Sequence, residues 1–239
     1  MVKALSREDG SMMKKAVVLG LKILLLTILM VASLAVSSAI VSIHTSQSES
    51  NSLILIFLYA LINTGILTIF IVNARPRGIK LIGITFMIFW GIQFFMTQIE
   101  TLYFNASVKM PIVDVLEVVI SGALTAVIFS SLAVLILGKF KKKDASHHHE
   151  SLFKGLISKS WLHILSLSVS YVIIYFLFGY FIAWQFPDLR YYYTGSKDIL
   201  NIFQHLSNQF RTDPILPLFQ LFRGLLWSGL SIIMEKKTR

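Results

Sequence analysis

Six long apolar segments limit the folds that are open to this chain. An α-helix needs about 20 residues to cross about 30 Å of hydrocarbon, and backbone polar groups in lipid must be satisfied within the segment itself. We therefore expect an all-α, polytopic integral membrane protein, a six-transmembrane-helix bundle that forms a single membrane domain over residues 1–239. The helices are predicted at about residues 16–43, 53–73, 81–101, 112–138, 161–185 and 215–234.

The composition supports a membrane environment. Hydrophobic residues make up 55% of the chain and charged residues 14%, and the mean hydropathy is +0.72. A soluble domain of 239 residues could not bury that much apolar surface. The net charge of +10 does not indicate a nucleic-acid partner, because the basic residues lie between apolar segments rather than on one folded face. The chain has no cysteine, which excludes disulfides and thiolate metal sites.

The loops differ in positive charge. Most of the 22 Lys and Arg residues flank the first segment or lie in 74–80, in 139–160 and after residue 234. Cytoplasmic loops carry an excess of Lys and Arg, so this bias predicts that both termini are cytoplasmic. The expected location is integral to the bacterial cytoplasmic membrane, the plasma membrane of such a host.

The first segment has a second interpretation. Lys14 and Lys15, followed by an apolar run that ends in Ala-Val-Ser-Ser-Ala, are also typical of a signal peptide. Cleavage would leave five helices with the same orientation. The run is nearer to about 20 residues than to the 7–15 of a signal peptide, which favours a retained helix.

The predicted cytoplasmic loop 139–160 is basic. Lys139–Lys143 form a cluster that attracts anionic lipid headgroups, although the same cluster also serves as a topology signal. His147, His148, His149 and Glu150 follow, but consecutive residues do not converge on one point of a helix. No metal site is therefore predicted.

The predicted outer loop 186–214 is rich in aromatic residues. Its tyrosine run, Tyr191–Tyr193, fits an aromatic belt at the membrane surface or a platform for a sugar or a lipid headgroup. Ser196 is the expected N-cap of an amphipathic surface helix over 198–210. This helix is interpreted as an interfacial anchor or as a lid.

Charged residues inside the spans are the best pointers to function, because burying an unpaired charge is costly. Glu117 and Arg223 are predicted at similar depth, and we expect either an ion pair between them or a snorkelling Arg223 beside a solvated Glu117. Gln93 and Glu100, seven residues apart, are expected to share one helix face. The candidate substrate-binding residues, near the outer ends of three helices, are Glu100, Asp114, Glu117, Gln220 and Arg223.

No catalytic residue or cofactor is predicted, because the sequence contains no nucleotide-binding, hydrolase or metalloprotease motif. The expected function is that of a non-catalytic, small permease-like or accessory membrane component with a polar pocket in the outer leaflet. A partner membrane protein would fit the accessory role. The alternative is a membrane-embedded enzyme that acts on a lipid or lipid-linked anionic substrate, with Glu100 or Glu117 as general base and Arg223 binding phosphate.

Overall fold

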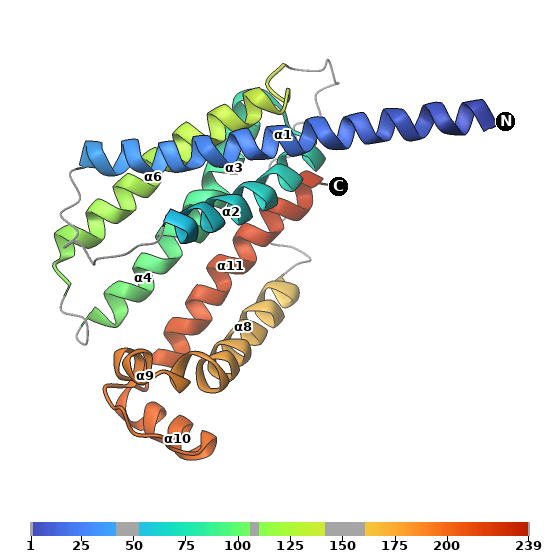
Figure 1. Ribbon diagram of the computed structural model, residues 1–239. Helices are drawn as coiled ribbons and strands as arrows, with labels where there is room; N and C mark the ends of the chain where they lie inside the picture. The colour runs from blue at the N-terminus through green and yellow to red at the C-terminus, as the bar shows by residue number, and fades with distance from the viewer. Residues whose placement is uncertain (1, 42–52, 106–109, 142–160, 239) are drawn as a thin grey trace. The chain divides into compact units, whose positions relative to one another are not determined.

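Most of the described residues are helical (Figure 1). The computed structural model describes residues 2–41, 53–105, 110–141 and 161–238, and no strand occurs within them. The elements are α1 (Val2–Val41), α2 (Leu53–Asn73), α3 (Gly78–Trp90), the π-helix η1 (Gly91–Phe95), α4 (Met96–Tyr103), α6 (Ile112–Ile136), α8 (Trp161–Phe181), the 3-10 helix η2 (Ala183–Gln185), α9 (Pro187–Thr194), α10 (Ile202–Thr212) and α11 (Leu216–Thr238).

Five helical stretches among the described residues are long and apolar enough to cross a membrane. They are Met13–Val41, Leu53–Asn73, Gly78–Tyr103, Ile112–Ile136 and Trp161–Gln185. A sixth is added if α10 and α11, which meet at 94°, count as one bent span. The prediction of a helical membrane bundle is confirmed, because a segment's length and hydrophobicity decide whether it can span.

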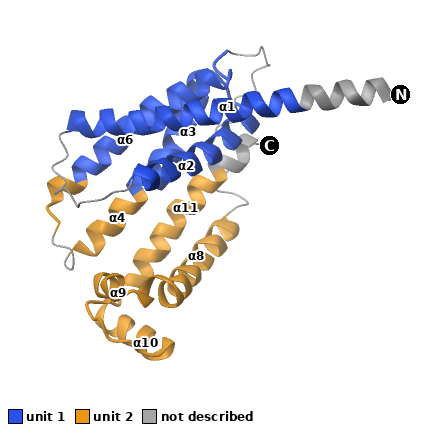
Figure 2. Ribbon diagram, viewed as in Figure 1, with its two compact units in different colours: residues 1–95, 116–143, 237–239 blue, residues 96–115, 144–236 orange. Residues whose placement is uncertain are grey.

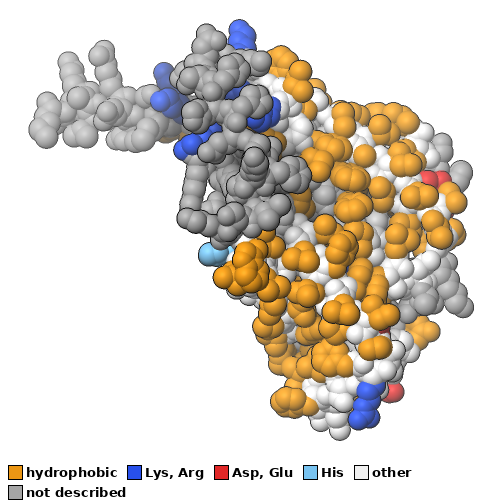
Figure 3. Space-filling view, turned by 180° about the vertical axis from the view of Figure 1, so that it is seen from behind, with side chains coloured by type: hydrophobic (Ala, Val, Ile, Leu, Met, Phe, Trp, Pro, Cys, Tyr) orange, Lys and Arg blue, Asp and Glu red, His pale blue; other side chains and the backbone are white. Residues whose placement is uncertain are grey.

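The surface of these helices is largely apolar. Large hydrophobic side chains stay exposed along the spans, among them Ile28, Ile62, Leu116 and Ile173. Hydrophobic side chains cover much of the face seen in the space-filling view (Figure 3). Such a surface suits contact with lipid tails, whereas in water it would promote aggregation.

The chain divides into two compact units (Figure 2). Unit 1 comprises residues 1–95, 116–143 and 237–239, and unit 2 comprises residues 96–115 and 144–236. In unit 1, the buried side chains include Leu26 and Met30 of α1, Leu81 and Phe89 of α3 and Phe129 of α6. Phe89 meets Phe129 edge to face, with ring centroids 5.6 Å apart, an arrangement that aromatic pairs prefer.

The loop that follows α2 is fastened to the end of α6 within unit 1. The Nζ of Lys139 donates to the carbonyl oxygen of Ala74 at 3.2 Å, and the backbone N–H of Gly78 donates to the carbonyl oxygen of Lys139 at 3.0 Å. Burial, and then the positive charge of Arg77, lower the pKa of Lys139 below its ordinary value. One lysine of the predicted headgroup cluster thus also has a structural contact. Lys142 and Lys143 of that cluster, as well as His147–Glu150, lie outside the described residues.

The π-helix η1 interrupts the span Gly78–Tyr103. A π turn departs from the 3.6-residue α-helical period on which the expected shared face of Gln93 and Glu100 rested. The two side chains have different partners. Gln93 accepts a hydrogen bond from the hydroxyl of Tyr59 at 3.4 Å in unit 1, whereas Glu100 binds Arg223 in unit 2.

Unit 2 is built around aromatic side chains. Its buried core consists of Phe104, Phe176, Trp184 and Leu216, with tyrosines of α8 and α9 packed against it. Small residues bring α8 and α11 together. A Cβ added to Gly224 would lie 2.8 Å from the carbonyl oxygen of Ser168, and the hydroxyls of Ser168 and Ser228 are 3.4 Å apart.

The outer segment of unit 2 differs from its prediction in two ways. The tyrosine run forms the helix α9, which ends at Gly195 with a positive φ of 70° that favours glycine. The surface helix starts at Ile202 rather than at residue 198, and Asn201 instead of Ser196 is its N-cap, accepting from the N–H of Gln204 at 2.9 Å. The expected Ser196 cap was wrong because that hydroxyl binds Asp198, 2.9 Å away.

Candidate functional site

Arg223 of α11 is the centre of the candidate site, and its side chain is only 6% exposed. Its Nη2 donates to Glu100 Oε2 of α4 at 2.7 Å, and its Nη1 donates to Gln220 Oε1 at 3.0 Å. Gln220 lies three residues before Arg223, so both side chains share one face of α11. A carboxylate and an amide thus hold the buried cation, as its desolvation requires.

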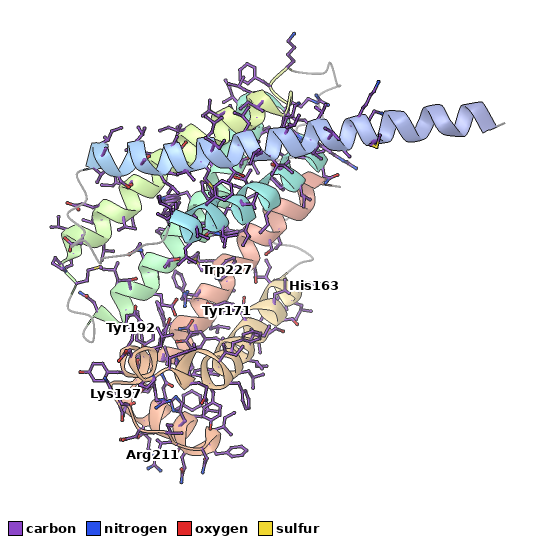
Figure 4. All side chains as sticks on the ribbon, in the orientation of Figure 1. His163, Tyr171, Tyr192, Lys197, Arg211 and Trp227 are labelled. Carbon is purple, nitrogen blue, oxygen red and sulfur yellow. The ribbon has the colours of Figure 1, made fainter. Side chains whose placement is uncertain are left out.

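Aromatic rings surround the guanidinium. Its carbon Cζ lies 5.9 Å from the ring centroid of Tyr171 on α8 and 5.8 Å from that of Phe219 on α11. Phe219 in turn stacks on Tyr103 with centroids 3.9 Å apart, and the Tyr103 hydroxyl donates to the carboxylate of Asp213 at 2.8 Å. Figure 4 labels Tyr171 on α8. Arginine favours such stacking because its planar cation is weakly hydrated.

Tyr193 of α9 hydrogen-bonds the acidic partner, Glu100, whose side chain is 17% exposed. Burial, and then the negative charge of Glu100, raise the pKa of Tyr193 well above its ordinary value. Its phenol therefore stays protonated at physiological pH and can donate to the carboxylate. The neighbouring Tyr192, labelled in Figure 4, hydrogen-bonds Thr101, so α9 is tied to α4 at two successive residues.

Three buried polar groups of this cluster have no hydrogen-bond partner among the described residues. They are the Nε of Arg223, the Nε2 of Gln220 and the hydroxyl of Tyr175. Gln220 is completely buried, and Tyr175 interacts electrostatically with both Glu100 and Arg223. An unpaired buried donor costs about 1–3 kcal/mol, a cost that a bound acceptor would remove. Three such donors around one cation favour a ligand with an anionic oxygen.

The structure brings together three of the five residues predicted from sequence, namely Glu100, Gln220 and Arg223. Asp114 and Glu117 lie half-buried on the first turns of α6, and Glu117 belongs to unit 1. The carboxylate that pairs with Arg223 in unit 2 is Glu100 rather than the expected Glu117. The difference arises because depth along a helix does not say which helix is the neighbour.

Sequence reasoning missed the tyrosines of the site. Tyr171 and Tyr175 are four residues apart on α8 and so share the helix face that meets Arg223 and Glu100, a spacing that would have been a usable signal. Tyr193 was hidden within the run interpreted as a membrane-surface belt. Its contact with Glu100 depends on the turn between α8 and α9, which the spacing of aromatic residues does not reveal.

Arg190 is a second buried arginine that the sequence analysis did not select. It is 3% exposed and lies on α9. Its Nε donates to the carbonyl of Trp184 at 2.6 Å, its Nη1 to the carbonyl of Lys197 at 2.5 Å and its Nη2 to the carbonyl of Gln185 at 3.1 Å. All three guanidinium nitrogens have partners, so Arg190 connects the loop after α9 to the 3-10 helix η2.

The surface helix α10 packs on the aromatic core of unit 2. The His205 ring stacks on Trp184 with centroids 4.8 Å apart, and Phe210 meets Phe176 edge to face at 5.4 Å. These contacts explain the apolar side of the amphipathic pattern. A role for this segment as a lid stays a prediction.

Within the described parts of the chain, no group of three or more His, Asp or Glu side chains is placed to hold a metal ion. Comparisons with known proteins add no further assignment, since no protein-family model, curated protein or solved structure matches the chain.

Proposed function

We propose that this protein is a small, non-catalytic permease-like or accessory component of a bacterial cytoplasmic membrane that binds a ligand with an anionic oxygen at Arg223. One observation carries the proposal. A buried arginine has a single carboxylate partner, Glu100, while its Nε and the Nε2 of Gln220 have no partner among the described residues. In our proposal both termini are cytoplasmic, and the site faces the outer leaflet.

In this mechanism Glu100 competes with the ligand for Arg223. Without ligand, the 2.7 Å ion pair neutralises the guanidinium in its low-dielectric surroundings. A carboxylate or phosphate oxygen would take up the donors of Arg223 and Gln220, and Glu100 would keep its hydrogen bond from Tyr193. Because Glu100 keeps its negative charge beside the site, it repels the bound anion and favours its release, and Glu100 can then pair with Arg223 again.

The test measures thermal unfolding of the purified protein with inorganic phosphate, glycerol 3-phosphate or succinate as probes. A bound ligand raises the unfolding temperature in proportion to its occupancy of the folded state. We expect the stabilisation to disappear in Arg223→Met and to persist in Arg211→Met. Arg211, labelled in Figure 4, is an exposed arginine of α10 and gives a matched loss of one charge.

Glu100→Gln separates ligand binding from a purely structural role. If Glu100 competes with the ligand, the variant should bind the same probe more tightly, by about tenfold, because each 1.4 kcal/mol of removed competition is a factor of ten. A structural pair predicts lower stability and no probe binding in any variant. Absence of probe binding in the wild type and in every variant would contradict the proposed function.

The enzyme alternative has one observation in its favour. An arginine and a tyrosine hydroxyl converge on the carboxylate of Glu100. Glu100 would then act as general base towards a lipid-linked substrate bound by Arg223. Under this alternative Glu100→Gln abolishes turnover while leaving substrate binding intact. The tighter probe binding that we expect of Glu100→Gln would contradict this alternative, because the loss of a general base leaves the affinity unchanged.

The proposed orientation can be tested because the chain contains no cysteine. A cysteine introduced at Lys197, whose side chain is 62% exposed, should react with a membrane-impermeant thiol reagent in intact cells. A cysteine at Lys141 should react only after the membrane is opened. The reverse pattern would place the Arg223 site on the cytoplasmic side.

A further inference from the structure

Unit 1 contains a groove of about 410 Å³ that is separate from the Arg223 site. Three lysines of α1, Lys14, Lys15 and Lys22, line it together with apolar side chains of three helical regions. The apolar lining residues are Val18 and Leu19 of α1, Val72 of α2 and Leu137, which follows α6. The groove therefore joins a cationic wall to an apolar floor.

The spacing of the α1 residues explains how they come to one groove. Lys14 and Val18 are four residues apart, as are Lys15 and Leu19, and Lys22 follows Val18 by four more. Residues at this spacing lie on one face of an α-helix. Val72 is in the last turn of α2, so the groove lies where α2 and α6 end.

The depth of the lysines matches the boundary of a bilayer. The candidate span Met13–Val41 has 29 residues, which at 1.5 Å per residue exceeds about 30 Å of hydrocarbon. The part beyond Lys22, residues 23–41, contains no charged residue and spans about 28 Å, enough to cross the hydrocarbon by itself. Lys22 then lies at the hydrocarbon edge, and the backbone of Lys14 and Lys15 lies about 10–12 Å further along the helix, from where the long lysine side chains can reach back to the headgroups.

Among the described residues, the ammonium groups of these lysines have no partner. No hydrogen bond or ion pair of Lys14, Lys15 or Lys22 occurs there, and the two ion pairs of the described chain, Lys197–Asp188 and Arg223–Glu100, belong to unit 2. Val18 is 52% exposed and Leu19 38% exposed. The groove thus presents three unneutralised cations beside uncovered apolar surface at headgroup depth.

We propose that this groove is a binding site for an anionic glycerophospholipid. The phosphate and any further anionic group of the lipid lie between Lys14, Lys15 and Lys22, and the start of an acyl chain covers Val18 and Leu19. A soluble anion would complement the lysines but leave the apolar floor uncovered. A zwitterionic lipid would cover the floor but would add no net charge to oppose three lysines.

The experiment measures lipid binding to the full-length protein by native mass spectrometry and by thermal unfolding. Phosphatidylglycerol is compared with phosphatidylcholine of the same acyl chains, and with glycerol 3-phosphate as a soluble headgroup. The test variant is K14Q/K15Q/K22Q. The matched control is R75Q/R77Q/K80Q, which removes three charges from the 74–80 segment, also in unit 1 but outside the groove.

We expect the wild type to retain phosphatidylglycerol over phosphatidylcholine. The response to the soluble headgroup is measured in an Arg223→Met background, which lacks the anion site proposed in unit 2, and we expect this response to be small. Each lysine near an anionic headgroup contributes about fivefold in affinity, so the test triple should lose at least about tenfold while the control triple loses less than about threefold. Equal losses in both triples would mean general charge attraction and would overturn the proposal. Unchanged retention in the test triple would overturn it as well.

A further variant tests the apolar floor without changing charge. V18S/L19S should reduce retention of phosphatidylglycerol by several-fold while leaving the small response to glycerol 3-phosphate unchanged, because only the lipid covers those side chains. If the serine variant binds the lipid like the wild type, or if the soluble headgroup binds as tightly as the lipid, the site is not one for a glycerophospholipid.

Discussion

Unit 2 buries two arginines, Arg190 and Arg223, and satisfies them in different ways. Arg190 binds three backbone carbonyls, one with each guanidinium nitrogen. Arg223 binds one carboxylate and one amide oxygen, and its Nε has no partner among the described residues. Both side chains are nearly inaccessible, so burial alone does not distinguish them.

The type of hydrogen-bond partner distinguishes an arginine with a structural role, Arg190, from an arginine that can bind a ligand, Arg223. Carbonyl oxygens near a helix C-terminus carry partial negative charge and cannot move away, so Arg190 is held permanently. A carboxylate can exchange its partner, and unpaired N–H donors can bind an acceptor atom of a ligand. The proposed function therefore rests on Arg223 and not on Arg190.

The largest effect on stability is expected from Arg190→Leu. The substitution leaves three carbonyls without their donor and should lower the free energy of unfolding by about 3 kcal/mol or more. Thermal unfolding in detergent measures this loss, and Arg211→Leu on the surface of α10 serves as the control. If Arg190→Leu unfolds at the wild-type temperature, the proposed division between the two arginines fails.

A smaller loss is expected from breaking the Arg223 pair. Arg223→Met and Glu100→Gln should each cost about 2 kcal/mol, below the 3–5 kcal/mol of fully buried pairs, because Glu100 keeps 17% exposure and its bond from Tyr193. The double variant should regain most of that loss, since neither partner is then left unpaired. Additive losses in the double-mutant cycle would contradict direct coupling between the two side chains.

Tyr193→Phe should cost about 1 kcal/mol, the value of one hydrogen bond to Glu100. The raised pKa of Tyr193 also predicts that the stability of the wild type depends on pH. The pKa of Tyr193 is raised by folding, so its contribution is fully present below the unfolded pKa of about 10 and is lost as the pH rises above it. Wild type should therefore lose more stability than Tyr193→Phe between pH 10 and 11. Parallel stability curves would show that Tyr193 is not perturbed.

The smallest effect is expected from Lys197→Ala. Its Nζ pairs with Asp188 at 3.2 Å, but the two side chains are 62% and 94% exposed, so the pair should contribute less than about 0.5 kcal/mol. Arg190 binds the backbone carbonyl of Lys197, which alanine retains. Chemical denaturation should give a midpoint close to that of wild type. A loss as large as that of Arg190→Leu would show that the side chain matters more than the carbonyl.

The spans could be predicted because helix formation in lipid is a local requirement. The predicted 53–73 coincides with α2, and the predicted 161–185 coincides with the candidate span Trp161–Gln185. Gly224 and Ser228 are four residues apart and share one face of α11, and this face contacts α8. The choice of Arg223 followed from the cost of placing a charge in a span.

The tertiary structure decided the partners. Glu100 rather than Glu117 pairs with Arg223, and Tyr193 joins the same cluster from a helix that was predicted to be part of a loop. Arg190 is buried and fully hydrogen-bonded only because α9 folds back onto the 3-10 helix η2. The amino-acid sequence alone indicates which segments are long and apolar enough to span a membrane, because backbone hydrogen bonding and hydrophobicity act along a single helix. Which charges meet depends on how helices distant in the chain lie against one another, and no periodicity within one segment contains that information.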